Sequence, residues 1–139
     1  NHGGNMGQDL VISGTVAAVR EACYHGLPAV ALSHYLISGV AMDWARIATW
    51  VPPLLRLVIE SPQQDGCFWN LNFPHLPPGN EALPEVVTTV PARSPLRVAY
   101  ERQGDAYQYT AHYRERPQDA GSDVATCFGG RISLSRVSL

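Results

Sequence analysis

Apolar residues near the start of the chain predict a helix followed by a buried strand. Residues 16–25 contain neither Gly nor Pro, Ser13 precedes them as a typical N-cap, and Gly26 followed by Pro28 marks a helix end. Residues 27–33 then form a short continuous apolar run, which favours a strand buried on both faces over an alternating edge strand. This succession is typical of an αβ unit.

The next apolar pattern has helical spacing and is interrupted by two prolines. A second helix is predicted to begin at residue 38 or 39 and to run through residue 50. Pro52 and Pro53 lack a backbone donor and crowd the preceding turn. We therefore expect residues 51–59 to form either a kinked continuation or a new helix.

Shorter stretches in the second half of the chain predict strands. They lie at residues 67–73, 85–90 and 131–138, with a short helical turn at residues 124–128 before the last of them. A β-hairpin is predicted at residues 96–114, with Tyr107, Tyr109 and Tyr113 on one face. Because an isolated hairpin is marginally stable in water, we expect it to pair with another subunit or to fold back on the body.

Two asparagines, Asn70 and Asn72, are unusual within the predicted strand 67–73. Asn is depleted in strands, and a buried amide needs hydrogen-bond partners. Their side chains either bond to a neighbouring loop or belong to a site at the carboxyl end of the sheet. The rarity of unpaired buried polar groups favours the loop-bonding role.

Length and charge limit the class of protein. With 139 residues the chain suits one domain, residues 1–139, and its net charge of −2 gives no basic surface for duplex nucleic acid. The ten basic residues are all arginines. A phosphate loop or Schiff base that needs a lysine is therefore excluded within these residues.

The cysteines and the hydropathy pattern indicate a cytoplasmic location. Cys23, Cys67 and Cys127 are odd in number and lack metal-site spacing, which argues against a disulfide framework and a zinc site. No apolar run approaches the roughly 18 residues of a spanning helix, so we expect no membrane partner. The chain opens on a glycine-rich loop with neither Met nor a preceding strand, and we expect it to be incomplete at its N-terminus.

Residues 1–15 have the composition of an anion site. Gly3, Gly4 and Gly7 permit unusual backbone conformations ahead of a helix whose first N–H groups lack intrahelical partners. Ser13 can cap that helix while Gly14 leaves space beside it. The helix dipole places partial positive charge there, which suits phosphate or carboxylate. The alternative is a tight connection with an ordinary helix cap.

Several motifs, in order and spacing, resemble the SurE survival proteins across the whole chain. They are Asn1-x-Gly-Gly-Asn5-x-Gly7, Ser13-Gly14-Thr15-Val16-Ala17-Ala18 with Glu21, residues 26–33, Asn70-Leu71-Asn72-Phe73-Pro74, and Ser122-Asp123 leading to residues 130–134. The resemblance implies an α/β fold, a Rossmann-like three-layer sandwich with a mostly parallel sheet. It also implies a protruding C-terminal hairpin used in assembly as a homodimer or homotetramer.

The same resemblance implies a metal-dependent nucleotidase that hydrolyses nucleoside 5′-monophosphates, and 3′-monophosphates as a further substrate class. It makes Asn1 a ligand of a divalent cation, Mg²⁺ or Mn²⁺. It makes Asn5 and Ser13 catalytic, with Ser13, Gly14 and Thr15 binding the substrate phosphate. In that picture the helix N-terminus takes up charge that develops on the phosphoryl group.

The sequence also departs from the family pattern. The family's adjacent Asp pair and its metal-binding Ser have no counterpart here, so three of four metal ligands are missing. Gln8 replaces an acidic residue, Ile12 an aromatic one, and Ser122 a Thr. We expect these 139 residues alone to be inactive. The alternative function is a non-catalytic phosphate-binding or oligomerisation module without a metal centre.

Overall fold

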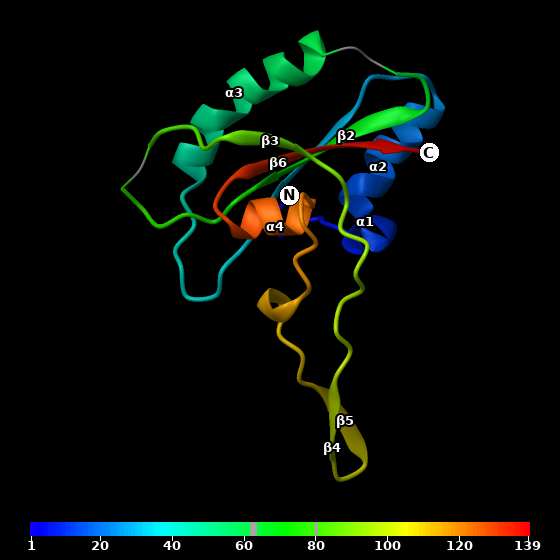
Figure 1. Ribbon diagram of the computed structural model, residues 1–139, viewed down its shortest axis with the longest axis vertical. Coiled ribbons are helices and arrows are strands. Elements are labelled where there is room, and N and C mark those ends of the chain that lie inside the picture. The colour runs from blue at the N-terminus through cyan, green and yellow to red at the C-terminus, as the bar shows by residue number, and fades with distance from the viewer. Residues whose placement is uncertain (62–63, 80) are drawn as a thin grey trace.

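A computed structural model describes residues 1–61, 64–79 and 81–139, and it shows an α/β architecture (Figure 1). A four-stranded sheet has the order β1-β2-β6-β3. Its strands are β1 (Val30–His34), β2 (Cys67–Phe73), β6 (Ile132–Ser138) and β3 (Val86–Thr89). The β1–β2 and β3–β6 pairs are parallel and the β2–β6 pair is antiparallel, so the mostly parallel sheet expected from the sequence is confirmed.

Helices cover both faces of this sheet and make a three-layer arrangement. The long helix α3 (Trp44–Glu60) lies on one face, and α2 (Gly14–Tyr24) and α4 (Asp123–Phe128) lie on the other (Figure 1). A four-residue helix, α1 (Asp9–Ile12), precedes α2 and was not predicted. Ser13 ends α1 and caps α2, and Gly26 follows α2 with a φ of 68°, as the sequence pattern predicted.

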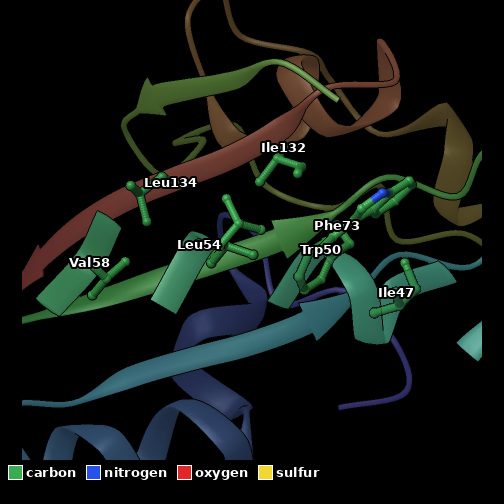
Figure 2. Close-up of a cluster of buried hydrophobic side chains, with 8 residues drawn as sticks. Ile47, Trp50, Leu54, Val58, Phe73, Ile132 and Leu134 are labelled. Atoms are coloured by element: carbon green, nitrogen blue, oxygen red, sulfur yellow. The ribbon is translucent and has the colours of Figure 1, made fainter. Parts of the chain in front are cut away.

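The α3 face holds the largest apolar cluster (Figure 2). Residues spaced by three and four along the helix face β2 and β6, and the labelled members are Ile47, Trp50, Leu54, Val58, Phe73, Ile132 and Leu134. Helix α3 takes the continuation through Pro52 and Pro53 that the sequence left open as one alternative, because this face is buried, but it does not begin at residue 38 or 39 as predicted. It begins at Trp44, capped by Asp43, and continues through both prolines to Glu60.

Pro52 and Pro53 are exposed, on the side of α3 away from the sheet. Each proline costs on the order of 3 kcal/mol in a helix interior. Burying one large apolar side chain returns about 1.5–3 kcal/mol, and four such side chains of α3 lie in the cluster. The packed face therefore outweighs the two lost backbone hydrogen bonds.

Residues 93–120, which we call the arm, leave the body and return to it (Figure 1). The far end is a hairpin of β4 (Tyr100–Gln103) and β5 (Ala106–Tyr109), and every residue of both strands is exposed. A short 3₁₀ turn, η1 (Tyr113–Glu115), lies on the returning limb. The expected protruding hairpin is present, although its strands are shorter than predicted.

One detail of the predicted hairpin was wrong. Tyr109 lies opposite Tyr100 in the ladder, with ring centroids 5.3 Å apart, and Tyr107 follows on the same face. Tyr113 does not belong to that face, because it lies in η1 and stacks near Tyr35, with centroids 6.1 Å apart. The Tyr113 hydroxyl donates a hydrogen bond to Asp9 in the body, and Tyr113 therefore does not follow the alternating pattern of the hairpin.

Candidate phosphate-binding site

The glycine-rich loop, residues 1–8, is held by polar side chains of the sheet. The backbone carbonyl of Asn5 accepts hydrogen bonds from Nδ2 of Asn70 (2.9 Å) and from Nδ2 of Asn72 (3.0 Å). The backbone N–H of Asn5 donates to Oδ1 of Asn72 (2.8 Å). Its own side chain donates to the hydroxyl of Ser33 (2.6 Å). The loop-bonding role favoured for Asn70 and Asn72 is therefore confirmed.

A buried carboxylate fixes the next turn of the loop. Asp123 has no exposed surface, and its oxygens accept from the N–H groups of Gly7 (2.8 Å), Ala92 (2.9 Å) and Val124 (2.8 Å). Burial raises the pKa of Asp123, while the three N–H donors favour the carboxylate and oppose that rise. One side chain thus joins the loop, α4 and the segment that leads to the arm.

Gly7 is required at its position for two reasons. Its φ of 54° lies in the left-handed region, and a Cβ there would come within 3.0 Å of the Ala92 carbonyl and 3.1 Å of Nη2 of Arg116. Any other residue would be strained and crowded. The loop conformation therefore depends on this glycine as well as on the carboxylate of Asp123.

The N-terminus of α2 follows the loop and exposes unused donors. Ser13 Oγ accepts from the Val16 N–H at 3.1 Å, which leaves the hydroxyl proton free to be donated. Within the described ranges, the N–H groups of Gly14 and Thr15 meet no acceptor. A Cβ added at Gly14 would find nothing within 4 Å, so a ligand can approach these amides. The arrangement offers two N–H donors and one O–H donor to an anion.

Asn1 lies at the carboxyl end of β1. Its amino nitrogen donates to the Leu32 carbonyl (2.8 Å), and its carbonyl accepts from the His34 N–H (3.0 Å). The side-chain Nδ2 donates to the Gly3 carbonyl (3.1 Å), so Oδ1 is the atom available to a cation. A neutral amide oxygen suits a hard divalent ion.

A complete metal centre needs more than this one oxygen donor. No group of three or more His, Cys, Asp or Glu side chains capable of holding a metal occurs among the described residues. Asn1 therefore fits the role of one ligand, and these residues do not form a full coordination shell.

A cavity of about 280 Å³ adjoins Asn1 on the α3 face and is lined by His34, Trp44 and Phe73 among others. The His34 Nδ1 lies 2.5 Å from the Tyr35 carbonyl, which fixes the proton on that nitrogen. Burial lowers the pKa of His34 from 6.5 to about 4, so the imidazole is neutral at physiological pH.

The structure brings some of the predicted site residues together and keeps others apart. Asn1 and Asn5 both contact the end of β1. Ser13, Gly14 and Thr15 lie at the start of α2, on the side of the sheet to which Asn5 points. In the described part of the chain, no hydrogen bond joins Asn1 or Asn5 to Ser13. Asn5 is only 7% exposed, and its hydrogen bonds to β1 and β2 hold the loop in place.

Sequence reasoning assigned no part in the loop to two residues that shape it, Asp123, which was quoted only as part of a motif, and Arg116. Both contact Met6 or Gly7 across more than 100 residues of sequence. A charged residue followed at once by an apolar helical turn was the available signal for Asp123. Arg116 carried no local signal, because it lies in an irregular segment.

Residues 1–95 match the family described as survival protein SurE. The chain belongs to the SurE family. The resemblance seen in the motifs is thereby confirmed.

Individual SurE relatives agree with this assignment. A provisionally named 5′-nucleotidase from Nostoc sp. is 44% identical over 137 residues, covering 99% of this chain and 60% of that protein. The 5′-nucleotidase SurE of Symbiobacterium thermophilum is 35% identical, covering 100% and 55%. The chain thus spans a little over half the length of these relatives.

A solved structure shows the same fold. The crystal structure of a SurE protein from Aquifex aeolicus superposes with a TM-score of 0.79 at 21% identity, over 99% of this chain and 56% of that one. The Rossmann-like α/β fold expected from the SurE resemblance is confirmed. None of the helices in the described residues is long and apolar enough to cross a membrane.

Proposed function

We propose that this chain supplies the phosphate-binding part of a nucleotidase that hydrolyses nucleoside 5′-monophosphates. The observation that carries the proposal is the start of α2, where two N–H groups and the Ser13 hydroxyl face open space behind a rigidly held glycine-rich loop. The names of the SurE relatives, which describe 5′-nucleotidases, supply the substrate class. A 3′-monophosphate would offer the same phosphate group to these donors.

The residues of this chain act by binding and orienting the phosphoryl group. The Gly14 and Thr15 amides and the Ser13 hydroxyl would donate to its oxygens, and the positive end of the α2 dipole would stabilise the added charge of the transition state. Asn5 keeps the loop in place through β1 and β2. Because these donors are fixed before the substrate binds, they need little reorganisation during the reaction.

A divalent cation, Mg²⁺ or Mn²⁺, is part of the proposal. Asn1 Oδ1 would be one of its ligands, alongside donors that the described residues do not provide. When bound, such an ion polarises a phosphoryl oxygen and lowers the pKa of a coordinated water. Asn1 would hold it at the carboxyl end of β1, where parallel α/β sheets bind their ligands.

The arm supports a second proposal, that the protein assembles as a homodimer or homotetramer through its hairpin. Tyr100, Tyr107 and Tyr109 are 58%, 70% and 49% exposed on one face of a two-stranded ladder far from the body. An aromatic face of this kind on an unsupported hairpin is typical of a protein interface. A monomer in light scattering would count against assembly.

Phosphate release from a nucleoside monophosphate by the complete gene product tests the function. We expect turnover that a chelator abolishes and that added Mg²⁺ or Mn²⁺ restores. Turnover that survives the chelator would reject the metal ion. A folded protein that binds phosphate but shows no turnover with any metal would favour the alternative, a non-catalytic phosphate-binding module.

A further inference from the structure

At the base of the arm, one buried arginine binds the glycine-rich loop and the residue that follows it. Arg116 is 3% exposed, and its Nη1 lies 2.8 Å from Oδ2 of Asp9. Nη2 donates to the Met6 carbonyl at 3.1 Å. The guanidinium thus binds both ends of the Met6–Asp9 turn, which contains Gly7 with its positive φ.

Tyr113 completes this contact from the same limb of the arm. Its hydroxyl donates to Oδ2 of Asp9 (2.5 Å) and accepts from Nη1 of Arg116 (2.7 Å). The guanidinium carbon also lies 4.9 Å from the Tyr113 ring centroid. Asp9 therefore receives two hydrogen bonds from the arm in a largely dry environment, where a planar, forked donor is well suited to a carboxylate.

The outgoing limb of the arm is attached to the same loop. The Leu96 N–H donates to Oε1 of Gln8 at 3.0 Å. Gln8 thus binds the outgoing limb of the arm, and its neighbour Asp9 binds the returning limb. The exposed hairpin beyond makes no such contact with the loop in the described structure.

A short chain of contacts connects Arg116 to the proposed phosphate donors. Asp9 is the first residue of α1, and its backbone carbonyl accepts the Ser13 N–H at 3.0 Å. A displacement of Asp9 would therefore move Ser13, and Ser13 sets the position of the first amides of α2. In the part of the chain that the structure describes, no hydrogen bond joins the Arg116 side chain to Ser13 or to the two residues after it.

We propose that Arg116 is a positioning residue, which clamps the base of the arm onto Asp9 and the Met6 carbonyl and thereby fixes the helix N-terminus that binds phosphate. The inference deepens the proposed function and rests on it for the identity of the ligand. It also assigns the base of the arm a role that is separate from subunit contact. The clamp belongs to a single chain and would act in any oligomeric state.

A matched pair of variants in the complete gene product tests this role. Arg116→Met keeps an unbranched, flexible stem and removes the charge and the hydrogen-bond donors. Arg46→Met is the control, because Arg46 is also buried and donates to backbone carbonyls, those of Leu76 and Pro77, next to α3. Both variants should lower thermal stability.

The two variants should differ at the loop. We expect Arg116→Met to lower the affinity for inorganic phosphate at least tenfold and to speed hydrogen exchange of the Ser13 N–H. We expect Arg46→Met to change both quantities less than twofold. Arg116→Lys, whose single ammonium can hold Asp9 but not Met6 as well, should restore part of the affinity.

Each outcome decides the matter. Equal losses of phosphate affinity in the Arg116 and Arg46 variants would overturn the positioning role, as would a loss that accompanies a changed oligomeric mass in light scattering. If Arg116→Met does not fold, Asp9→Asn replaces it, because Asn keeps the shape of Asp and removes its charge. Asp9→Asn should lower the phosphate affinity by a smaller factor, and an unchanged phosphate affinity in this variant would refute the clamp. A wild-type protein that binds no phosphate would refute the proposed function instead, and the Ser13 exchange rate alone would then decide the clamp.

Discussion

Replacing Ser13 by Asp or by Asn separates its two roles, capping α2 and binding phosphate. Both replacements are good N-caps, so either side chain can accept the Val16 N–H that Ser13 accepts at 3.1 Å. They have nearly the same shape and differ by one negative charge. The helix dipole should favour the Asp variant by about 0.3–1 kcal/mol.

The same charge should oppose the ligand. Two unit charges about 4 Å apart interact by roughly 4 kcal/mol at the effective dielectric constant of a protein surface. Ser13 is only half-buried, so solvent and salt reduce this repulsion, and we take about 1.4–3 kcal/mol as the remaining cost. This corresponds to about a tenfold to hundredfold loss of phosphate affinity relative to Asn.

Stability and affinity should therefore change in opposite directions. Thermal unfolding should rank Ser13→Asp at or above Ser13→Asn, while calorimetric titration with inorganic phosphate, and turnover of a nucleoside monophosphate, should rank it far below. Ser13→Ala gives the cost of losing the cap alone, about 1 kcal/mol. Equal phosphate affinity in the Asp and Asn variants would refute a phosphate site at this helix terminus.

Four further outcomes are expected. Gly14→Ala should keep or slightly raise stability, because the added Cβ meets nothing within 4 Å and Ala has less freedom than Gly in the unfolded chain, yet it should weaken phosphate binding in a titration by filling the approach to the amides. Asp123→Asn should cost about 1–3 kcal/mol in urea unfolding, since its amide would turn an N–H toward a backbone donor that the carboxylate now accepts. Asn1→Ala should lower turnover of the complete gene product, and added Mn²⁺ should restore part of it by mass action; no rescue at any metal concentration would argue against a ligand role. His34 has a folded pKa of about 4 against 6.5 unfolded, so below pH 6.5 the unfolded chain binds a proton that the folded one does not. Stability measured with chelator should fall by up to about 3 kcal/mol as the pH drops from 6.5 to 4, and His34→Asn, which keeps a side-chain N–H, should abolish that fall.

Local chemistry in the sequence determined the regular elements and the helix caps. The β2 strand occupies the predicted residues 67–73, Ser13 caps α2 as expected, and Gly26 follows the end of that helix. These features depend on alternation, on a capping side chain and on one residue that tolerates a positive φ. All are encoded within a few neighbouring positions. The same holds for the exposed N–H groups at the start of α2, which depend on the absence of a side chain at Gly14.

Tertiary contacts decided what the local pattern left open and where it was wrong. Helix α3 passes through Pro52 and Pro53 because its opposite face is buried against the sheet. Tyr113 leaves the hairpin face because Asp9 accepts its hydroxyl, across 104 positions of sequence. Arg116 reaches Met6 across 110 positions. No local periodicity records such pairs, since buried polar groups choose their partners only once the chain has packed.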